Sequence, residues 1–344
     1  MTPPRSIAVV QTAFAGDVIL TLPLIQLLHE RYPGAELTAV TIPAAAELLA
    51  GHPAVARVLP YDKRGSDGGI RGFLRMAARL RAAGCDVAVI PHRSLRSALL
   101  AFMARIPRRI GFDRSAGRFM LTDCVRYAAA DHEIARNLAL AGPLGIRPEG
   151  ITLPRLYPSE ADVRSVDAFL RGGQAGPDDA RVAVAPGSVW ATKRWPEENF
   201  AALIRLLLGR NMRVVLIGGA EDRELCARLA RGAGSAAVAD AAGRFSLTGS
   251  AALIARCRGL VSNDSAPVHI AVAMGVPVVA LFGPTHPRFG FAPAGPGDAV
   301  VDVDGLACRP CSIHGGNRCP TGTFDCMRRI SAARVMEALF SRPA

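Results

Sequence analysis

An acidic residue lies in the turn that follows the first apolar run of the chain. Residues 6–11 form a β-branched run typical of a buried strand, and Gly16 and Asp17 come shortly after it. Gly16 permits a tight turn, and Asp17 falls at the N-terminus of a helix predicted at residues 17–31. The Asp17 carboxylate either caps free N–H groups of that helix or acts as a general base in a cleft. The turn lacks the Gly-x-Gly-x-x-Gly spacing of a dinucleotide-binding loop.

A second group of polar residues lies between residues 185 and 196, after another predicted strand. It contains Ser188, Thr192 and Lys193. Of the 41 basic residues, only Lys63 and Lys193 are lysines, so a compact ammonium group is unusual in this arginine-rich chain. Hydroxyl groups and an ammonium at a strand end suit an anionic ligand. The alternative is a set of solvated charges beside a hydrophobic staple.

A third turn carries a glycine pair and two carboxylates. Gly219 allows close backbone approach, and either Glu221 or Asp222 can accept hydrogen bonds from a ribose. Glycine pairs are common in turns between a strand and a helix. This turn therefore favours a nucleotide site only in combination with the other turns.

A fourth turn opens a helix after a later strand. Asp264, Ser265 and Ala266 form its beginning, and Pro267 suits an early helical position. Free N–H groups and the helix dipole favour a phosphate there, and Asp264 either caps the helix or binds a sugar hydroxyl. His269 lies one turn into the helix, where it is either a ligand contact or a packed structural residue.

Four cysteines lie close together near the C-terminus. Cys308, Cys311, Cys319 and Cys326 have the spacing C-x2-C-x7-C-x6-C. In a reducing compartment, closely spaced thiols bind metal more often than they form disulfides, so a structural zinc site is one prediction. Because the spacing is not two matched Cys-x2-Cys pairs, free or redox-sensitive thiols are the alternative.

The elements that must position these residues alternate between strand and helix. The sequence predicts a parallel α/β sheet in each half of the chain. A proline- and glycine-rich stretch around residues 148–177 separates the halves. The predicted divisions are an N-terminal domain at residues 1–158, a linker region at 159–178 and a C-terminal domain at 179–344. Ligands of such doubly wound sheets bind at the carboxyl ends of the strands, so the cleft between the two sheets is the expected site.

Composition excludes several classes of protein. The 344 residues are 50% apolar and 20% charged, which argues against disorder, and no apolar run is long enough to span a membrane. The net charge is +12, and residues 57–118 contribute 14 Lys/Arg against 4 Asp/Glu. Nucleic acid is not expected as a partner, since aromatic residues are only 6% and no binding motif is present. The expected location is the cytoplasm.

Five short motifs follow one another along the chain in a specific order and spacing. They are Gly16-Asp17-Val18 with Leu22-Pro23-Leu24, Pro186-Gly187 with Lys193-Arg194-Trp195-Pro196, Gly219-Ala220-Glu221, Asn263-Asp264-Ser265 with His269, and Phe282-Gly283-Pro284-Thr285. Together they resemble the ADP-heptose:lipopolysaccharide heptosyltransferases, glycosyltransferase family 9. The Lys-Arg-Trp-Pro and Asn-Asp-Ser forms are most similar to the heptosyltransferase II branch. The resemblance implies a GT-B fold, with two facing Rossmann-like domains, and an inverting transfer of heptose.

The resemblance also implies roles for individual residues. Asp17 corresponds to the catalytic base, Lys193 to the lysine that holds the donor's phosphate and sugar, and Glu221 to the carboxylate that binds the ribose. The implied donor-binding set is Gly16, Ser188, Thr192, Lys193, Gly219, Glu221, Thr248, Asp264, Ser265, Ala266 and His269. Enzymes of this fold often use no catalytic metal, so metal-independent transfer is expected. The four cysteines have no role inherited from the family.

The acceptor that the resemblance implies is strongly anionic. It is a Kdo2-lipid A or heptosyl-Kdo2-lipid A molecule in the inner leaflet, and the basic segment 57–118 would bind it or rest on the anionic membrane surface. The candidate residues are Lys63, Arg64, Arg93, Arg96 and Arg118, with Arg105, Arg108 and Arg109 as further members. The alternative reading is a GT-B enzyme, a transferase or an epimerase, that uses another nucleotide sugar.

Overall fold

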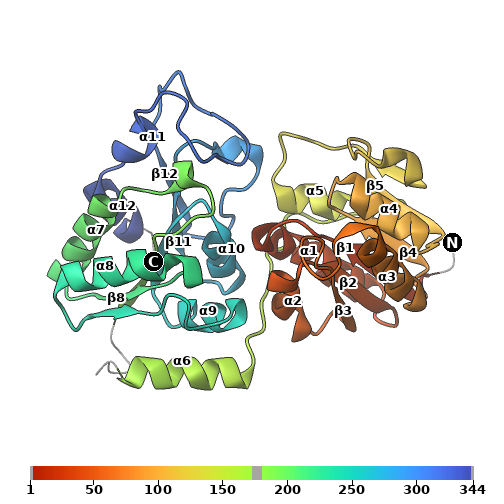
Figure 1. Ribbon diagram of the computed structural model, residues 1–344, viewed down its shortest axis with the longest axis horizontal. Helices are drawn as coiled ribbons and strands as arrows, with labels where there is room; N and C mark the ends of the chain where they lie inside the picture. The colour runs from red at the N-terminus through yellow and green to blue at the C-terminus, as the bar shows by residue number, and fades with distance from the viewer. Residues whose placement is uncertain (1–2, 173–179, 342–344) are drawn as a thin grey trace. The chain divides into compact units, whose positions relative to one another are not determined.

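The computed structural model describes residues 3–172 and 180–341. The chain divides into two compact units, Met1–Tyr157 and Pro158–Ala344 (Figure 1). This division falls one residue before the predicted end of the N-terminal domain. Within the predicted linker region, α6 (Glu160–Gly172) is a helix of the second unit that packs against α9 (Leu247–Ile254). Residues 173–178 of that linker lie outside the described part.

The first unit contains a parallel sheet in the order β3-β2-β1-β4-β5-β6. Its central strands are short apolar runs, such as Ser-Ile-Ala-Val-Val in β1, that are buried on both faces. The described strands are β1 (Ser6–Val10), β2 (Glu36–Thr41), β3 (Arg57–Pro60), β4 (Val87–Ile90), β5 (Arg108–Phe112) and β6 (Asp123–Val125).

Helices cover this sheet with their apolar sides. In α3, Met76 and Leu80 lie one turn apart on the buried side, and the exposed side is rich in arginine. These residues pack with Leu100 of α4 and with Val10 and Ile90 of the strands into one apolar cluster. The helices of this unit are α1 (Ala15–Arg31), α2 (Pro43–Ala50), α3 (Gly69–Ala82), α4 (Leu95–Met103) and α5 (Glu133–Ala139), with 3-10 turns η1 (Arg118–Met120) and η2 (Gly142–Leu144).

The second unit repeats the architecture of the first. Its sheet has the order β12-β11-β10-β7-β8-β9, and every neighbouring pair is parallel. The strands are β7 (Arg181–Ala185), β8 (Arg213–Leu216), β9 (Val238–Asp240), β10 (Gly259–Asn263), β11 (Val278–Phe282) and β12 (Ala299–Asp302).

The apolar core of the second unit lies between this sheet and its helices. It includes Trp195, Phe200 and Met327. The remaining helices are α7 (Glu197–Gly209), α8 (Arg223–Ala233), α10 (Ala266–Ala273), α11 (Asp325–Arg328) and α12 (Ala332–Phe340), with 3-10 turns η3 (Ala191–Lys193), η4 (Ala220–Asp222) and η5 (Pro287–Phe289). No helix of the described residues is long and apolar enough to cross a membrane.

Both sheets reverse their strand order at one position. In the first unit the reversal lies between β1 and β4, and in the second between β7 and β10. The loops that follow these strands are where doubly wound sheets bind ligands. The predicted pair of parallel α/β halves is confirmed, and each half has one such position.

Candidate active site

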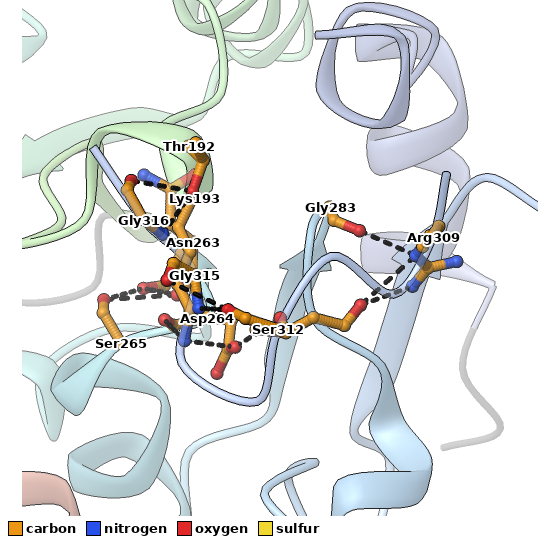
Figure 2. A network of polar contacts seen from close by, with 12 residues as sticks. Thr192, Lys193, Asn263, Asp264, Ser265, Gly283, Arg309, Ser312, Gly315 and Gly316 are labelled. Carbon is orange, nitrogen blue, oxygen red and sulfur yellow. Dashed lines mark hydrogen bonds and ion pairs between the residues drawn. The ribbon is translucent and has the colours of Figure 1, made fainter. Parts of the chain in front are cut away.

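The loops after β7 and β10 bring a lysine and an aspartate into contact. The Lys193 Nζ atom lies 2.6 Å from Asp264 Oδ2, and the two side chains are only 12% and 9% exposed (Figure 2). Thr285, in the turn after β11, donates its hydroxyl to the same oxygen at 2.7 Å. Both of these bonds use Oδ2, and among the described residues no hydrogen bond to Asp264 Oδ1 is seen. Oδ1 can therefore accept from a ligand hydroxyl.

Asn263 fixes the loop that carries Lys193. Its side chain is fully buried, and its amide donates to Pro186 O at 2.8 Å and accepts from the Trp195 backbone N–H at 3.0 Å. Trp195 in turn donates its indole N–H to Ile330 O at 3.1 Å within the core. The Lys193 loop is therefore held at both ends, which orders the ammonium group before any ligand binds.

The helix that follows Asp264 starts with uncapped amide groups. Ser265 is the N-cap residue of α10, but its hydroxyl donates to Asn263 O at 3.2 Å and caps no helix N–H. The N–H group of Ala266 and the positive end of the helix dipole are thus available to an anion beside Lys193. His269 is 6% exposed, which favours the packed reading over a direct ligand contact.

The two carboxylates of the glycine turn after β8, Glu221 and Asp222, have different surroundings. Asp222 is partly buried and accepts the Gly219 N–H at 3.0 Å, so it shapes the turn. Burial raises the pKa of Asp222, and the hydrogen bond from Gly219 opposes that rise. Glu221 is exposed, and of the two carboxylates it is the one left for a ribose.

Thr248 and Ser188 lie in other loops of the second unit. Thr248 is in the first turn of α9, where its hydroxyl lies 2.9 Å from that of Ser246. Ser188 contributes its carbonyl, which accepts from Arg194 Nε at 2.8 Å. Within the part of the chain that the structure describes, neither side chain is seen to bond to Lys193 or Asp264, so their roles in donor binding stay predictions.

In the first unit, Asp17 lies in the first turn of α1, close after β1. The sequence reading of Asp17 as the cap of the helix is wrong in its position, because α1 begins at Ala15 and its N-cap residue is Phe14. Asp17 Oδ2 instead accepts the backbone N–H of Phe14 at 3.2 Å. Gly16 lies in the same turn. The side chain of Asp17 is partly exposed, and its role as a general base stays a prediction.

A buried carboxylate near Asp17 was missed from the sequence. Glu133 at the start of α5 pairs with Arg136 Nη2 at 2.6 Å, with side chains 11% and 2% exposed. Burial raises the pKa of Glu133, the Arg136 charge opposes this rise, and the negative charge of Asp17 adds to it. The sequence signal was the i, i+3 spacing of the two charges.

Basic and hydroxyl groups gather where β1, β3 and β4 end. Lys63 Nζ donates to Thr12 O at 2.6 Å, and Thr12 Oγ1 lies 3.0 Å from His92 Nδ1. Burial, together with the charges of Lys63 and Arg93, lowers the pKa of His92 to about 4, so its ring is neutral at pH 7. Burial and the charges of Arg64 and Arg96 lower the pKa of Lys63. His92 and Thr12 were not singled out from the sequence.

The remaining predicted acceptor residues divide into two kinds, and Arg64 and Arg105 belong to the first, the exposed ones. Arg93, Arg96 and Arg118 are exposed; Arg93 lies over the Tyr127 ring, and Arg96 donates to the Tyr61 hydroxyl at 3.0 Å. The side chains of Arg108 and Arg109, in β5, bond to the segment 120–123 beside them. Arg108 pairs with Asp123 at 3.0 Å and Arg109 donates to Met120 O at 2.6 Å. These two guanidinium groups have structural partners, and an acceptor-binding role for them stays a prediction.

The four clustered cysteines carry free thiols. Cys326 is buried, Cys308 and Cys319 are partly exposed, and Cys311 is exposed. Within residues 3–172 and 180–341, no three His, Cys, Asp or Glu side chains form a group able to hold a metal ion. The zinc site stays a prediction. Metal analysis of protein purified without chelator tests it: stoichiometric zinc would support it, and only a trace would contradict it.

Comparison with known proteins agrees with this arrangement. Residues 73–315 match glycosyltransferase family 9, the heptosyltransferase family. Lipopolysaccharide heptosyltransferase 1 of Pseudomonas aeruginosa is 31% identical over 98% of this chain and 98% of its own length. Lipopolysaccharide heptosyltransferase 2 of Salmonella typhimurium is 29% identical over 82% of this chain and 84% of its own.

The solved structure of Escherichia coli ADP-heptose lipopolysaccharide heptosyltransferase II is also similar. It has a TM-score of 0.79 and 26% identity, and the likeness covers 98% of each chain. This likeness confirms the predicted GT-B fold class. A family match over most of the chain, with a relative of 31% identity along nearly its whole length, establishes that the chain is a glycosyltransferase of family 9.

Proposed function

We propose that this enzyme transfers heptose from ADP-L-glycero-D-manno-heptose to the inner core of lipopolysaccharide. The observation that carries the proposal is the ion pair of Lys193 and Asp264, 2.6 Å apart where the strand order of the second unit reverses. The relatives that match along most of the chain bear the names of lipopolysaccharide heptosyltransferases, and one solved relative is named for ADP-heptose.

In the proposed reaction the donor is held by the second unit. Lys193 and the N–H groups at the start of α10 bind the diphosphate, Glu221 accepts from the ribose, and Asp264 Oδ1 accepts from a heptose hydroxyl. As the anomeric carbon–oxygen bond breaks, its electron pair goes to the β-phosphate oxygen of the departing ADP. The ammonium group and the helix dipole stabilise that developing charge, and no catalytic metal is needed in this scheme.

The acceptor contributes the other half of the reaction. Its hydroxyl oxygen attacks the anomeric carbon from the face opposite ADP, so the configuration inverts, and Asp17 takes the hydroxyl proton. The acceptor we propose is heptosyl-Kdo2-lipid A, with Kdo2-lipid A as the alternative. Both are anionic, which suits the exposed arginines around Lys63. An acceptor of this kind places the enzyme at the cytoplasmic face of the inner membrane.

A donor panel tests the nucleotide specificity of the proposal. Purified enzyme is incubated with Kdo2-lipid A acceptors and either ADP-heptose or UDP-sugars, and release of the nucleoside diphosphate is measured. We expect acceptor-dependent release from ADP-heptose alone. Release from a UDP-sugar, or thermal stabilisation by UDP but not by ADP, would favour a different nucleotide-sugar enzyme of the same fold.

A further inference from the structure

A segment of the cysteine-rich region lies directly against the lysine of the candidate site. Gly316 and Thr192 are 124 residues apart in sequence but share three hydrogen bonds (Figure 2). The Thr192 N–H and hydroxyl donate to Gly316 O at 3.0 and 2.9 Å, and the Gly316 N–H donates to Thr192 Oγ1 at 2.8 Å. The backbone at Gly316 is therefore fixed next to Lys193.

Because Gly315 has no side chain, the Lys193 side chain can pack directly against its backbone. Its φ is +88°, a conformation that favours glycine. A Cβ atom at this position would lie 3.1 Å from Lys193 Cγ and 3.3 Å from Lys193 Cε. Any larger residue would therefore push against the aliphatic part of the lysine, whose ammonium group lies 2.6 Å from Asp264.

The other end of the segment supports Asp264 through a threonine. Arg309 is 4% exposed at its side chain and pairs with Asp302 at 2.8 Å. Its guanidinium also donates to Gly283 O at 2.7 Å and to Thr285 O at 3.1 Å. These bonds fix the turn from which the Thr285 hydroxyl reaches Asp264 Oδ2.

We propose that residues 309–316 position the Lys193–Asp264 pair for the donor's diphosphate, with Gly315 and Arg309 as the positioning residues. The inference rests on the proposed role of Lys193 in donor binding. Gly315 leaves room for the Lys193 side chain. Arg309 holds the backbone of Thr285, whose hydroxyl bonds to the same oxygen of Asp264 as Lys193 does. Both act from a segment that follows the last donor-site motif in the sequence, and neither needs to touch the donor.

The test compares two glycine substitutions with the same backbone cost. Gly315→Ala introduces a methyl group against Lys193. Gly322→Ala lies in the same region at φ +73°, but its Cβ would have nothing within 4 Å. We expect Gly315→Ala to weaken ADP binding and to lower kcat/KM for the donor by about 10- to 100-fold relative to Gly322→Ala. Tm should be lowered similarly in both variants.

A second readout follows the lysine itself and does not depend on turnover. Because the chain has only two lysines, protein labelled with ¹³Cε-lysine gives two assignable signals. Gly315→Ala should shift the Lys193 signal and leave the Lys63 signal in place, whereas Gly322→Ala should shift neither. For Arg309, the Arg309→Lys and Thr285→Val substitutions should have non-additive effects on ADP affinity, because they act along one path.

The outcomes separate this inference from the proposed function. Equal ADP affinity and equal kcat/KM in the two glycine variants, with an unmoved Lys193 signal, would overturn the positioning role of Gly315. Additive effects of Arg309→Lys and Thr285→Val would overturn that of Arg309. A wild-type enzyme that binds UDP rather than ADP would refute the proposed donor, and the same variants measured with UDP would still decide the positioning role.

Discussion

Among single residues, the charged groups of the candidate donor site are held in fixed positions. Lys193 and Asp264 form a pair whose side chains are 12% and 9% exposed, and Thr285 shares the same carboxylate oxygen. Such a pair costs desolvation energy that the attraction only partly offsets, so its presence favours a functional role over a stabilising one. An incoming diphosphate adds negative charge beside the ammonium group.

Replacement of Asp17 by asparagine separates its contact with Phe14 from its proposed role as a base. Asn retains an oxygen that can accept the Phe14 N–H, so the start of α1 should keep its stability. Asn cannot take a proton, so kcat should fall about 10²- to 10⁴-fold with little change in donor KM. Steady-state kinetics and thermal denaturation of Asp17→Asn measure the two effects. Near-normal turnover in a stable variant would remove Asp17 from the base role.

His52 predicts a pH dependence of stability. It is 3% exposed, its Nδ1 accepts the Ala54 N–H at 3.2 Å, and within the described residues its Nε2 has no partner. Burial, with a smaller effect of His29, lowers its pKa to about 4. Between pH 6.5 and pH 4 the unfolded chain therefore binds a proton at His52 that the folded chain does not, and acid favours unfolding.

The expected contribution of His52 is a loss of about 3 kcal/mol in the free energy of unfolding as pH falls through this window. Urea denaturation at several pH values measures it, with His52→Asn as the control because Asn keeps an acceptor for Ala54 without titrating. The wild type should lose more stability than His52→Asn between pH 6.5 and 4. Parallel pH profiles would contradict the assignment.

At the scale of elements, the first unit depends on how α5 is held against α1. Asn137 is fully buried and donates to Leu20 O of α1 at 3.1 Å. The preceding residue, Arg136, pairs with Glu133 one turn earlier in the helix. Arg136 also lies over the Tyr127 ring, 5.0 Å from its centroid. A buried pair in this position helps to fix α5 against α1.

Removal of one partner should therefore be costly. Arg136→Met leaves Glu133 buried without its partner and should reduce the free energy of unfolding by about 3–5 kcal/mol. Arg136→Met combined with Glu133→Gln should recover part of this loss. The matched control is Arg164→Met, which breaks an exposed pair with Glu160 and should cost at most about 1 kcal/mol. Equal losses in Arg136→Met and Arg164→Met would show that the buried pair is unimportant.

The elements found from the sequence are those whose pattern is apolar. The central strands β1, β2, β4, β7, β10 and β11 are continuous Val-, Ile- and Leu-rich runs, which periodicity predicts. The pattern is weaker in β5, β6, β9 and β12, of which β6, β9 and β12 lie at sheet edges. β9 is only Val-Ala-Asp, and β5 begins with Arg108 and Arg109. Edge strands need few apolar residues, so their pattern is weak.

The candidate site was found in pieces for a similar reason. Each turn with polar residues at a strand end was visible in the sequence, because such turns interrupt apolar runs. The bond between Lys193 and Asp264 was not predictable, since it depends on which strands are neighbours. The contact of Gly315 with Lys193 was also hidden, because nothing in the local sequence relates a cysteine-rich segment to a loop more than 120 residues earlier.

In the whole molecule, the two units share an architecture but differ in the polar side chains at corresponding positions. Each has the same strand order and one position where that order reverses, yet the side chains there differ. The first unit gathers a carboxylate, a neutral histidine and exposed arginines. The second gathers a paired lysine and a helix N-terminus with no side-chain cap. The proposed reaction assigns the acceptor to the groups of the first unit and the donor to those of the second.

The central claim is that this glycosyltransferase adds one heptose to a lipid A acceptor that carries Kdo. Mass spectrometry of Kdo2-lipid A and heptosyl-Kdo2-lipid A after incubation with ADP-heptose and the purified enzyme tests it most directly. We expect one of the two acceptors to gain the mass of a single heptose, and Lys193→Met to reduce this product greatly. Both acceptors remaining unmodified, with an enzyme that is folded and binds ADP, would contradict it.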